Sequence, residues 1–283
     1  MKSTLALSSA ALLALAKADG PYTLGSGADD VSSEAWASVA ESANLTSSQT
    51  FTGRDVSSEF PGSSADGWTV SLAVRDNLPA EDGDDVLTAT TLTLTAADEE
   101  SSIDDSWRVC AHVFPVLSSS NPGFASEVPG CDGLVATECV DDLAKQGRGK
   151  FGEGCPSWKI TPSCLRDLSE QKGYGVVIDD NLISGNASFF RQVDGSHAAD
   201  DESVYMTAAL QAYAVVTVFG PSGDSDEDAF AEVTCILPDT VEGDSVHPAP
   251  EQLEEEEEDA AAGLTKFVGW AGLTGAVALQ FLF

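Results

Sequence analysis

Three segments of this chain alternate between apolar and polar residues with a period of two, as a β-strand with one buried face does. They are residues 68–74, residues 86–95, in which one out-of-step Thr suggests a bulge, and residues 107–114, which stop at Pro115. Pro, Asp and Gly residues separate the first two segments at 77–83, as a connecting loop requires. Because such strands must bury their apolar face against another layer, the pattern predicts a mainly β domain.

Further apolar runs extend this pattern towards the C-terminus. Residues 175–178, 205–219 and 229–237 predict strands, and the acidic connection 220–228 predicts an exposed hairpin loop. Several short strands joined by loops are typical of two packed sheets. We therefore expect a disulfide-stapled β-sandwich over residues 62–238.

A segment without alternation, residues 129–172, interrupts the strands. Its residues 134–146 predict a helix that Gly147 ends, with an apolar side formed by Leu134, Val135, Cys139 and Leu143. Thr161 and Pro162 are suited to an N-cap and a first helical position, which predicts a second short helix. Helices this short cannot bury a core unaided, so we expect a Cys-rich two-helix insert held by disulfides.

The cysteines number six: Cys110, Cys131, Cys139, Cys155, Cys164 and Cys235. An even number in an exported chain predicts three disulfides, although six cysteines allow fifteen pairings. Cys110 and Cys235 lie outside the insert, each in a strand-like run, and we expect them to pair with each other. A zinc site needs closely spaced ligand pairs such as C-x2-C, which this sequence lacks, so no metal site is expected.

The segments on either side of the sandwich differ from it in composition. Residues 19–61 are rich in Ser and Gly and predict one short helix at 32–43, capped by Ser32 or Ser33. Residues 239–260 contain prolines and the glutamate run 254–258 and have little to bury. They predict an acidic, disordered stalk.

Both ends of the sequence have features of export and anchoring. Residues 1–18 predict a cleaved signal peptide, with an apolar stretch and a small-x-small site that ends at Ala18, so the mature chain would begin at Asp19. Small residues from Ala260 lead into the apolar run 267–283, the layout of a glycosylphosphatidylinositol (GPI) signal. We expect attachment at Ala260, or at the neighbouring Asp259 or Ala261, and removal of residues 261–283. The rival interpretations are a retained membrane helix, for which 17 uncharged residues is near the lower limit, and a buried terminal strand or helix.

Charge narrows the range of partners. The chain has 13 basic and 47 acidic residues; without Lys2, Lys17 and Lys266 the mature form keeps 10 basic residues, for a net charge of −37. A surface this acidic argues against nucleic acid as a partner. It is typical of a soluble, self-repelling surface protein.

No pattern in the sequence identifies catalytic residues. The chain lacks G-x-S-x-G, and its histidines are His112 in a predicted strand, His197 in a polar loop and His247 in the stalk. Paired carboxylates could hydrolyse a glycoside, but 47 acids make some close pair almost inevitable. The acidic stretches 194–202 and 224–228 lack the Gly and distal Glu of an EF-hand loop. We therefore expect no catalytic residue, cofactor or metal site.

Two sequons predict N-glycosylation, at Asn44 (Asn-Leu-Thr) and at Asn186 (Asn-Ala-Ser), each in a polar, loop-like setting. The whole layout resembles the GPI-anchored surface proteins of filamentous fungi, with a signal peptide, a Ser/Thr-rich acidic domain with six cysteines, an acidic stalk and an Ala/Gly-led apolar tail.

The resemblance implies a location at the plasma membrane or cell wall, with the GPI lipid and cell-wall polysaccharide as candidate partners, and carries no catalytic residue. We expect a non-enzymatic surface glycoprotein. The alternative is a carbohydrate-active enzyme or a carbohydrate-binding module, which would require two carboxyls about 5–10 Å apart beside an aromatic wall. Nothing in the sequence predicts an oligomeric state.

Overall fold

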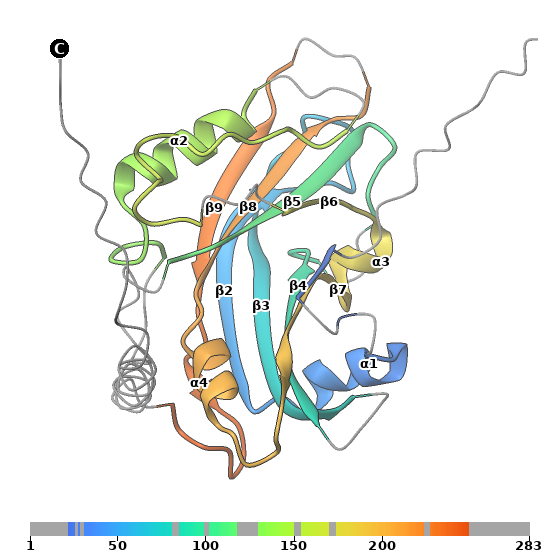
Figure 1. Cartoon of the computed structure of the whole chain (residues 1–283). Helices are drawn as coiled ribbons and strands as arrows, with labels where there is room; N and C mark the ends of the chain where they lie inside the picture. Colours follow the sequence, from blue (N-terminus) through green and yellow to red (C-terminus); the bar gives the residue numbers. More distant parts are fainter. Residues whose placement is uncertain are drawn as a thin grey trace, which may run out of the picture.

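Two β-sheets pack face to face and form most of the molecule (Figure 1). The computed structural model describes residues 22–25, 28, 31–80, 85–98, 102–117, 130–149, 154–169, 174–223 and 227–248. The first sheet has the order β1-β7-β4-β3-β2-β10, and the second has the order β6-β5-β8-β9. The strands are β1 (Tyr22–Leu24), β2 (Leu45–Arg54), β3 (Ser64–Pro79), β4 (Val86–Thr95), β5 (Trp107–Pro115), β6 (Tyr174–Ile178), β7 (Ser184–His197), β8 (Tyr213–Pro221), β9 (Phe230–Ile236) and β10 (Thr240–Val241). The helices are α1 (Ser33–Glu41), α2 (Thr137–Gly147), α3 (Asp180–Ile183) and α4 (Ser203–Ala209). The prediction of a mainly β, disulfide-stapled sandwich is confirmed.

The inner face of the first sheet follows from the alternation in β3. Val70, Leu72 and Val74 point into the core between the sheets. On the opposite face, Ala73 belongs to a smaller apolar cluster beneath α1, together with Trp36 and Val39 of that helix. Ser32 caps α1, as predicted, because its hydroxyl accepts the Ala35 N–H at 3.1 Å. The helix therefore covers only part of the outer face.

β8 is buried along its whole length because both of its faces are covered. Tyr213, Val215 and Phe219 pack into the core between the sheets. The alternate residues, Ala214, Val216 and Val218, pack into a second core on the other side, beneath the Cys-rich insert. The second sheet is thus the middle of three layers on this side of the molecule.

Two of the three disulfides join the insert to the second sheet, and the third lies within the insert. The bonds are Cys110–Cys155, Cys131–Cys235 and Cys139–Cys164. The predicted Cys110–Cys235 bond is wrong, because β8 lies between β5 and β9 and separates the two residues. Two strand spacings amount to roughly 9.5 Å, beyond the reach of a disulfide. Each residue instead bonds to a cysteine of the insert.

The insert contains one helix within its described residues instead of the two predicted. The first predicted helix is α2, which begins at Thr137. The segment after Thr161 forms turns, with the amides of Cys164 and Leu168 bonded to the carbonyls three or four residues earlier. The Thr161 hydroxyl lies 2.7 Å from the Ser163 hydroxyl and, among the described residues, accepts no N-cap bond from a backbone amide. The bond from Cys164 to Cys139 holds these turns against α2 without a second helix.

Two predicted segment boundaries differ from the structure. β2 lies inside residues 19–61, which we expected to hold only one short helix, and it pairs with β3 along ten residues. Residues 240–241 form β10 on the edge of β2, inside the predicted stalk. Segment 45–54 was missed because its Ser and Thr residues alternate with few apolar ones, although Leu45 and Phe51 still reach the core.

Two more elements replace predicted ones. The predicted strand 205–219 is α4 followed by β8, since Tyr205, Ala208 and Ala209 are buried with helical spacing. The polar loop expected at His197 is the end of β7, a strand of 14 residues that pairs with β4. A buried apolar run cannot be assigned to helix or strand by periodicity alone.

Candidate functional site

Each of the three histidines has a different setting. His112, on β5, is 3% exposed, and neither ring nitrogen has a hydrogen-bond partner within the described residues. Its ring packs edge-on against Trp158 at 4.9 Å and covers Gly175, where a Cβ atom would lie 2.3 Å from the ring. Burial lowers the pKa of His112 to about 3, so the ring is neutral. His247 bonds the Pro248 carbonyl and lies near the end of the described residues.

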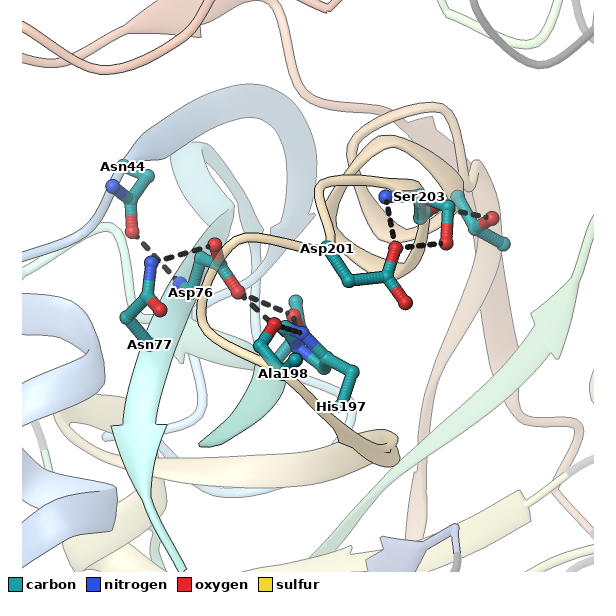
Figure 2. Close-up of polar contacts among 9 residues, drawn as sticks. Asn44, Asp76, Asn77, His197, Ala198, Asp201 and Ser203 are labelled. Atoms are coloured by element: carbon teal, nitrogen blue, oxygen red, sulfur yellow. Dashed lines mark hydrogen bonds and ion pairs between the residues drawn. The ribbon is translucent and has the colours of Figure 1, made fainter. Parts of the chain in front are cut away.

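His197 belongs to a polar cluster at one end of the first sheet, where it lies beside Asp76 of β3 (Figure 2). Thr88 of β4 is the third member of the cluster. The His197 Nε2 atom lies 3.0 Å from Thr88 Oγ1 and 3.4 Å from Asp76 Oδ1. Thr88 Oγ1 donates to Asp76 Oδ1 at 2.7 Å, and Asn77 Nδ2 donates to Asp76 Oδ2 at 2.9 Å. The other ring nitrogen lies 3.0 Å from the Ala198 carbonyl. We call Asp76, Thr88 and His197 the His197 cluster.

Asn77, next to Asp76, has an unusual backbone conformation. It has φ 57°, in the left-handed region that Asn tolerates better than most residues. The register between β3 and β4 shifts between Arg75 and Leu78, so Asn77 lies at an irregularity in the pairing. Asp76 lies within the same irregularity, and its Oδ1 is 3.4 Å from His197 Nε2.

The solvent exposure of the His197 cluster determines whether a substrate can reach it. The His197 side chain is 2% exposed, and Thr88 is 0% exposed. The hydroxyl at hydrogen-bond distance from the imidazole is therefore one that a substrate cannot reach, which rules out nucleophilic catalysis through Thr88. The cluster joins the ends of β3, β4 and β7, and this is a structural role.

A cavity of about 220 Å³ lies beside the cluster, lined by Asp76, Glu202, Tyr205 and the segment 244–246, among others. The Tyr205 hydroxyl donates to the Val246 carbonyl at 2.9 Å, and Asn44 Nδ2 donates to Ser245 Oγ at 3.1 Å. Further along this segment, the Glu242 amide donates to the Asn44 carbonyl. Residues 239–246 are thus fastened to the folded body, and the predicted stalk cannot begin at 239.

Two groups that interact with the His197 cluster have shifted pKa values. Burial raises the pKa of Asp194 against the opposing effects of a hydrogen bond from Gln192 and the charge of His197. Burial, with smaller contributions from Asp76 and Glu202, raises the pKa of Tyr205 to about 12. Tyr205 therefore stays protonated and donates its hydrogen bond to Val246 at any physiological pH.

The predicted processing sites lie mostly outside the described residues. These are Ala18 and Asp19 at the signal cleavage site and Asp259, Ala260 and Ala261 at the expected lipid attachment site. All six cysteines are described, and all are paired. Among the described residues, no group of three or more His, Cys, Asp or Glu side chains is arranged to hold a metal ion. In the same ranges, no helix has the length and apolar character needed to span a bilayer.

The two sequons differ in their surroundings. Asn186 is exposed on β7, not in a loop. Asn44 is half-buried, and its Oδ1 accepts the Asp76 amide at 2.8 Å while its Nδ2 donates to Ser245. Asn44 thus connects the His197 cluster to the C-terminal segment. The sequence identified Asn44 as a sequon but gave no signal for Asp76 or Thr88.

Three comparisons, with protein-family models, with curated proteins and with solved structures, find no match to this chain. The three disulfides indicate an oxidising, extracellular type of environment.

Proposed function

We propose that this protein is an exported, GPI-anchored surface glycoprotein whose folded domain has no catalytic function and is displayed at the plasma membrane or cell wall. The observation that carries the proposal is the complete pairing of the cysteines. Each disulfide joins elements far apart in the sequence, by 45, 104 and 25 residues, which suits a domain that must survive outside the cell.

The sequences flanking the domain support export and anchoring. The small-x-small site at Ala18 supports cleavage of the signal peptide, and the small residues from Ala260 before the apolar run 267–283 support exchange of that run for lipid. Residues 239–246 are bonded to the domain, so a flexible tether to the lipid would begin after residue 248.

The surroundings of the aromatic residues do not favour the alternative of a carbohydrate-active enzyme. Trp36, Trp68 and Trp107 are buried, and Trp158 packs against His112 and Phe114. One groove does bring Asp228 and Glu232 to the aromatic ring of Phe230. The Arg54 guanidinium lies 3.9 Å over that ring, however, and occupies the face that a sugar would use. Arg54 is itself held there by the carbonyls of Pro61 and Gly62.

Treatment of intact cells with phosphatidylinositol-specific phospholipase C tests the anchor. We expect release of the protein into the medium. The double variant Phe267→Asp, Val277→Asp should prevent anchoring, because two charges in the apolar run stop it from holding the chain in the membrane. A mature protein that resists the phospholipase and contains peptides with Gln280 would instead have a retained membrane helix.

A further inference from the structure

The outer face of the first sheet carries a regular array of hydroxyl groups. Strand pairing places them in rows across β2, β3 and β4. One row is Thr50, Thr69 and Thr95. The next is Ser48, Ser71 and Thr93, extended onto β7 by Ser188. The third is Thr46, Ala73 and Thr91, extended by Arg191. We call the nine Ser and Thr residues of these rows the hydroxyl face.

The spacing of the hydroxyl face follows from sheet geometry. Neighbouring strands lie about 4.8 Å apart, and alternate residues along one strand lie about 6.6 Å apart. Ser48 and Ser71 are close enough for their hydroxyls to bond at 3.1 Å. The face therefore repeats donors and acceptors at short, regular intervals in two directions.

The face is open in its centre. A hollow of about 500 Å³ lies over it, lined by Ser48, Ser71, Thr91 and Thr93, with Ala40 of α1 on one border and Thr240 of β10 on another. Thr91 is only 3% exposed, and its Oγ1 has no hydrogen-bond partner in the described part of the chain. A hydroxyl at the base of this hollow is thus unsatisfied, and a polar ligand seated above it could supply the missing bond after a rotation about χ1 of Thr91.

The chemistry of the face selects the type of ligand. The paired rows contain no Asp or Glu, in a chain that has 47 of them. Two carboxylates border the face: Glu242 accepts a hydrogen bond from Thr46 Oγ1 at 2.8 Å, and Asp239 lines the hollow. A Ser or Thr hydroxyl both donates and accepts, so it pairs best with ligand groups that do the same. Anionic polymers are repelled by the net charge of −34, and an apolar ligand would leave the hydroxyls without partners. A neutral polymer rich in hydroxyl groups satisfies both conditions.

We propose that the hydroxyl face binds a neutral, extended polysaccharide through rows of hydrogen bonds. The inference rests on the proposed extracellular location, where such polymers occur, but needs no anchor. Trp36 of α1 lies at the border of this face, in the apolar cluster that includes Ala73, and is only 6% exposed. Because its ring is therefore not available to stack on a sugar, each sugar is held by hydrogen bonds alone, and affinity accumulates over several sugars. The competing explanation is that Thr is simply a good strand former on a solvent-facing surface.

The test uses the full chain, secreted from a eukaryotic host and released by phospholipase C or detergent, with particles of insoluble β-1,3-glucan and of chitin. We expect saturable binding to at least one of them. The variant Thr50→Val, Thr69→Val, Thr93→Val keeps side-chain shape and strand propensity but removes three hydroxyls, and it should weaken binding at least about tenfold. Thr207→Val, on the exposed side of α4, is the matched control and should bind as the unmodified chain does.

A second variant guards against artefacts of added apolar surface. Ser48→Lys with Thr93→Glu leaves the net charge unchanged and places two long side chains on either side of Ser71, and it should also abolish binding. The proposal would be overturned if the unmodified chain bound neither polymer, or if the valine variant bound as tightly as the unmodified chain. So would equal binding to the anionic polymer polygalacturonate. Hydroxyl-dependent adsorption to ice without polysaccharide binding would show that the face orders water. None of these outcomes depends on the phospholipase result, so the proposed GPI anchor and the proposed polysaccharide binding are tested independently.

Discussion

Replacement of His112 by phenylalanine should remove a specific acid sensitivity from this protein. The histidine is neutral and buried between Trp158 and Gly175, and burial lowers its pKa to about 3. In the unfolded chain the same side chain has a pKa of about 6.5. Between these two values the unfolded chain binds a proton that the folded chain does not. Stability is therefore complete above pH 6.5 and is lost progressively as the pH falls towards 3.

The size of the effect follows from the separation of the two pKa values. Each pH unit below 6.5 costs about 1.4 kcal/mol until the folded-state pKa is approached. At pH 4.5, two units below the unfolded pKa, the loss relative to pH 7 is about 2.5 kcal/mol. That is a substantial part of the 5–15 kcal/mol by which domains are typically stable.

Urea unfolding with the disulfides intact, followed by tryptophan fluorescence at pH 7 and pH 4.5, measures this loss. Many carboxylates also titrate in this range, so the quantity of interest is the difference between the unmodified chain and His112→Phe. We expect the variant to lose about 2.5 kcal/mol less on acidification. His247→Gln, which removes a histidine outside the core, is the control and should lose as much as the unmodified chain. Equal losses in His112→Phe and the unmodified chain would mean that the His112 ring takes up a proton without unfolding.

Other consequences of the structure can be measured directly. Replacing Cys131 and Cys235 by alanine should lower the free energy of unfolding by roughly 4.7 kcal/mol, and replacing Cys139 and Cys164 by roughly 3.5 kcal/mol, because the first bond closes a loop of 104 residues and the second a loop of 25. Thermal unfolding measures which variant is less stable, and the reverse order would contradict the loop-closure argument. Asn44→Ala should cost about 1–3 kcal/mol, since it leaves the Asp76 amide and Ser245 without their partner. Asn186→Gln should remove a glycosidase-sensitive mass and change stability by less than about 0.5 kcal/mol; its retention of that mass would place the glycan elsewhere. N-terminal sequencing of the secreted protein should begin at Asp19, and a sequence that includes Met1 would exclude cleavage.

The strands that the sequence predicted are those with a recognisable alternation or a continuous apolar run. β3, β4 and β5 were predicted from alternation, and each overlaps its predicted segment. β6, β8 and β9 were predicted as apolar runs. β7 was missed because its alternation is broken: Phe189 and Phe190 are adjacent in the chain and both fully buried. The pairing of β7 with β4 shifts register three times, and these irregularities let neighbouring residues face the core. Local pattern cannot reveal an irregularity that depends on the partner strand.

The same limit explains the disulfide error and the missed polar cluster. The pairing of Cys110 depended on strand order, because a single intervening strand, β8, separates it from Cys235. The His197 cluster gathers Asp76, Thr88 and His197 from three strands, and the last two are 109 positions apart in the sequence. Asp and Thr are common throughout this chain, so neither residue type marks the site. Only the order and register of β3, β4 and β7 bring these side chains together.

The path of the C-terminal segment links the anchor to the hydroxyl face. Residues 239–246 run along the edge of β2 and are bonded to Thr46, Ser47 and Asn44 of that region. Asp239 and Thr240 also line the hollow over the hydroxyl face, so this segment forms one border of the proposed binding surface. If the lipid is attached at Ala260, residues 249–260 can span at most about 40 Å, little more than the roughly 33 Å length of β2. The hydroxyl face would then be held within a short distance of the membrane, where it could bind only polymer that lies close to the lipid surface.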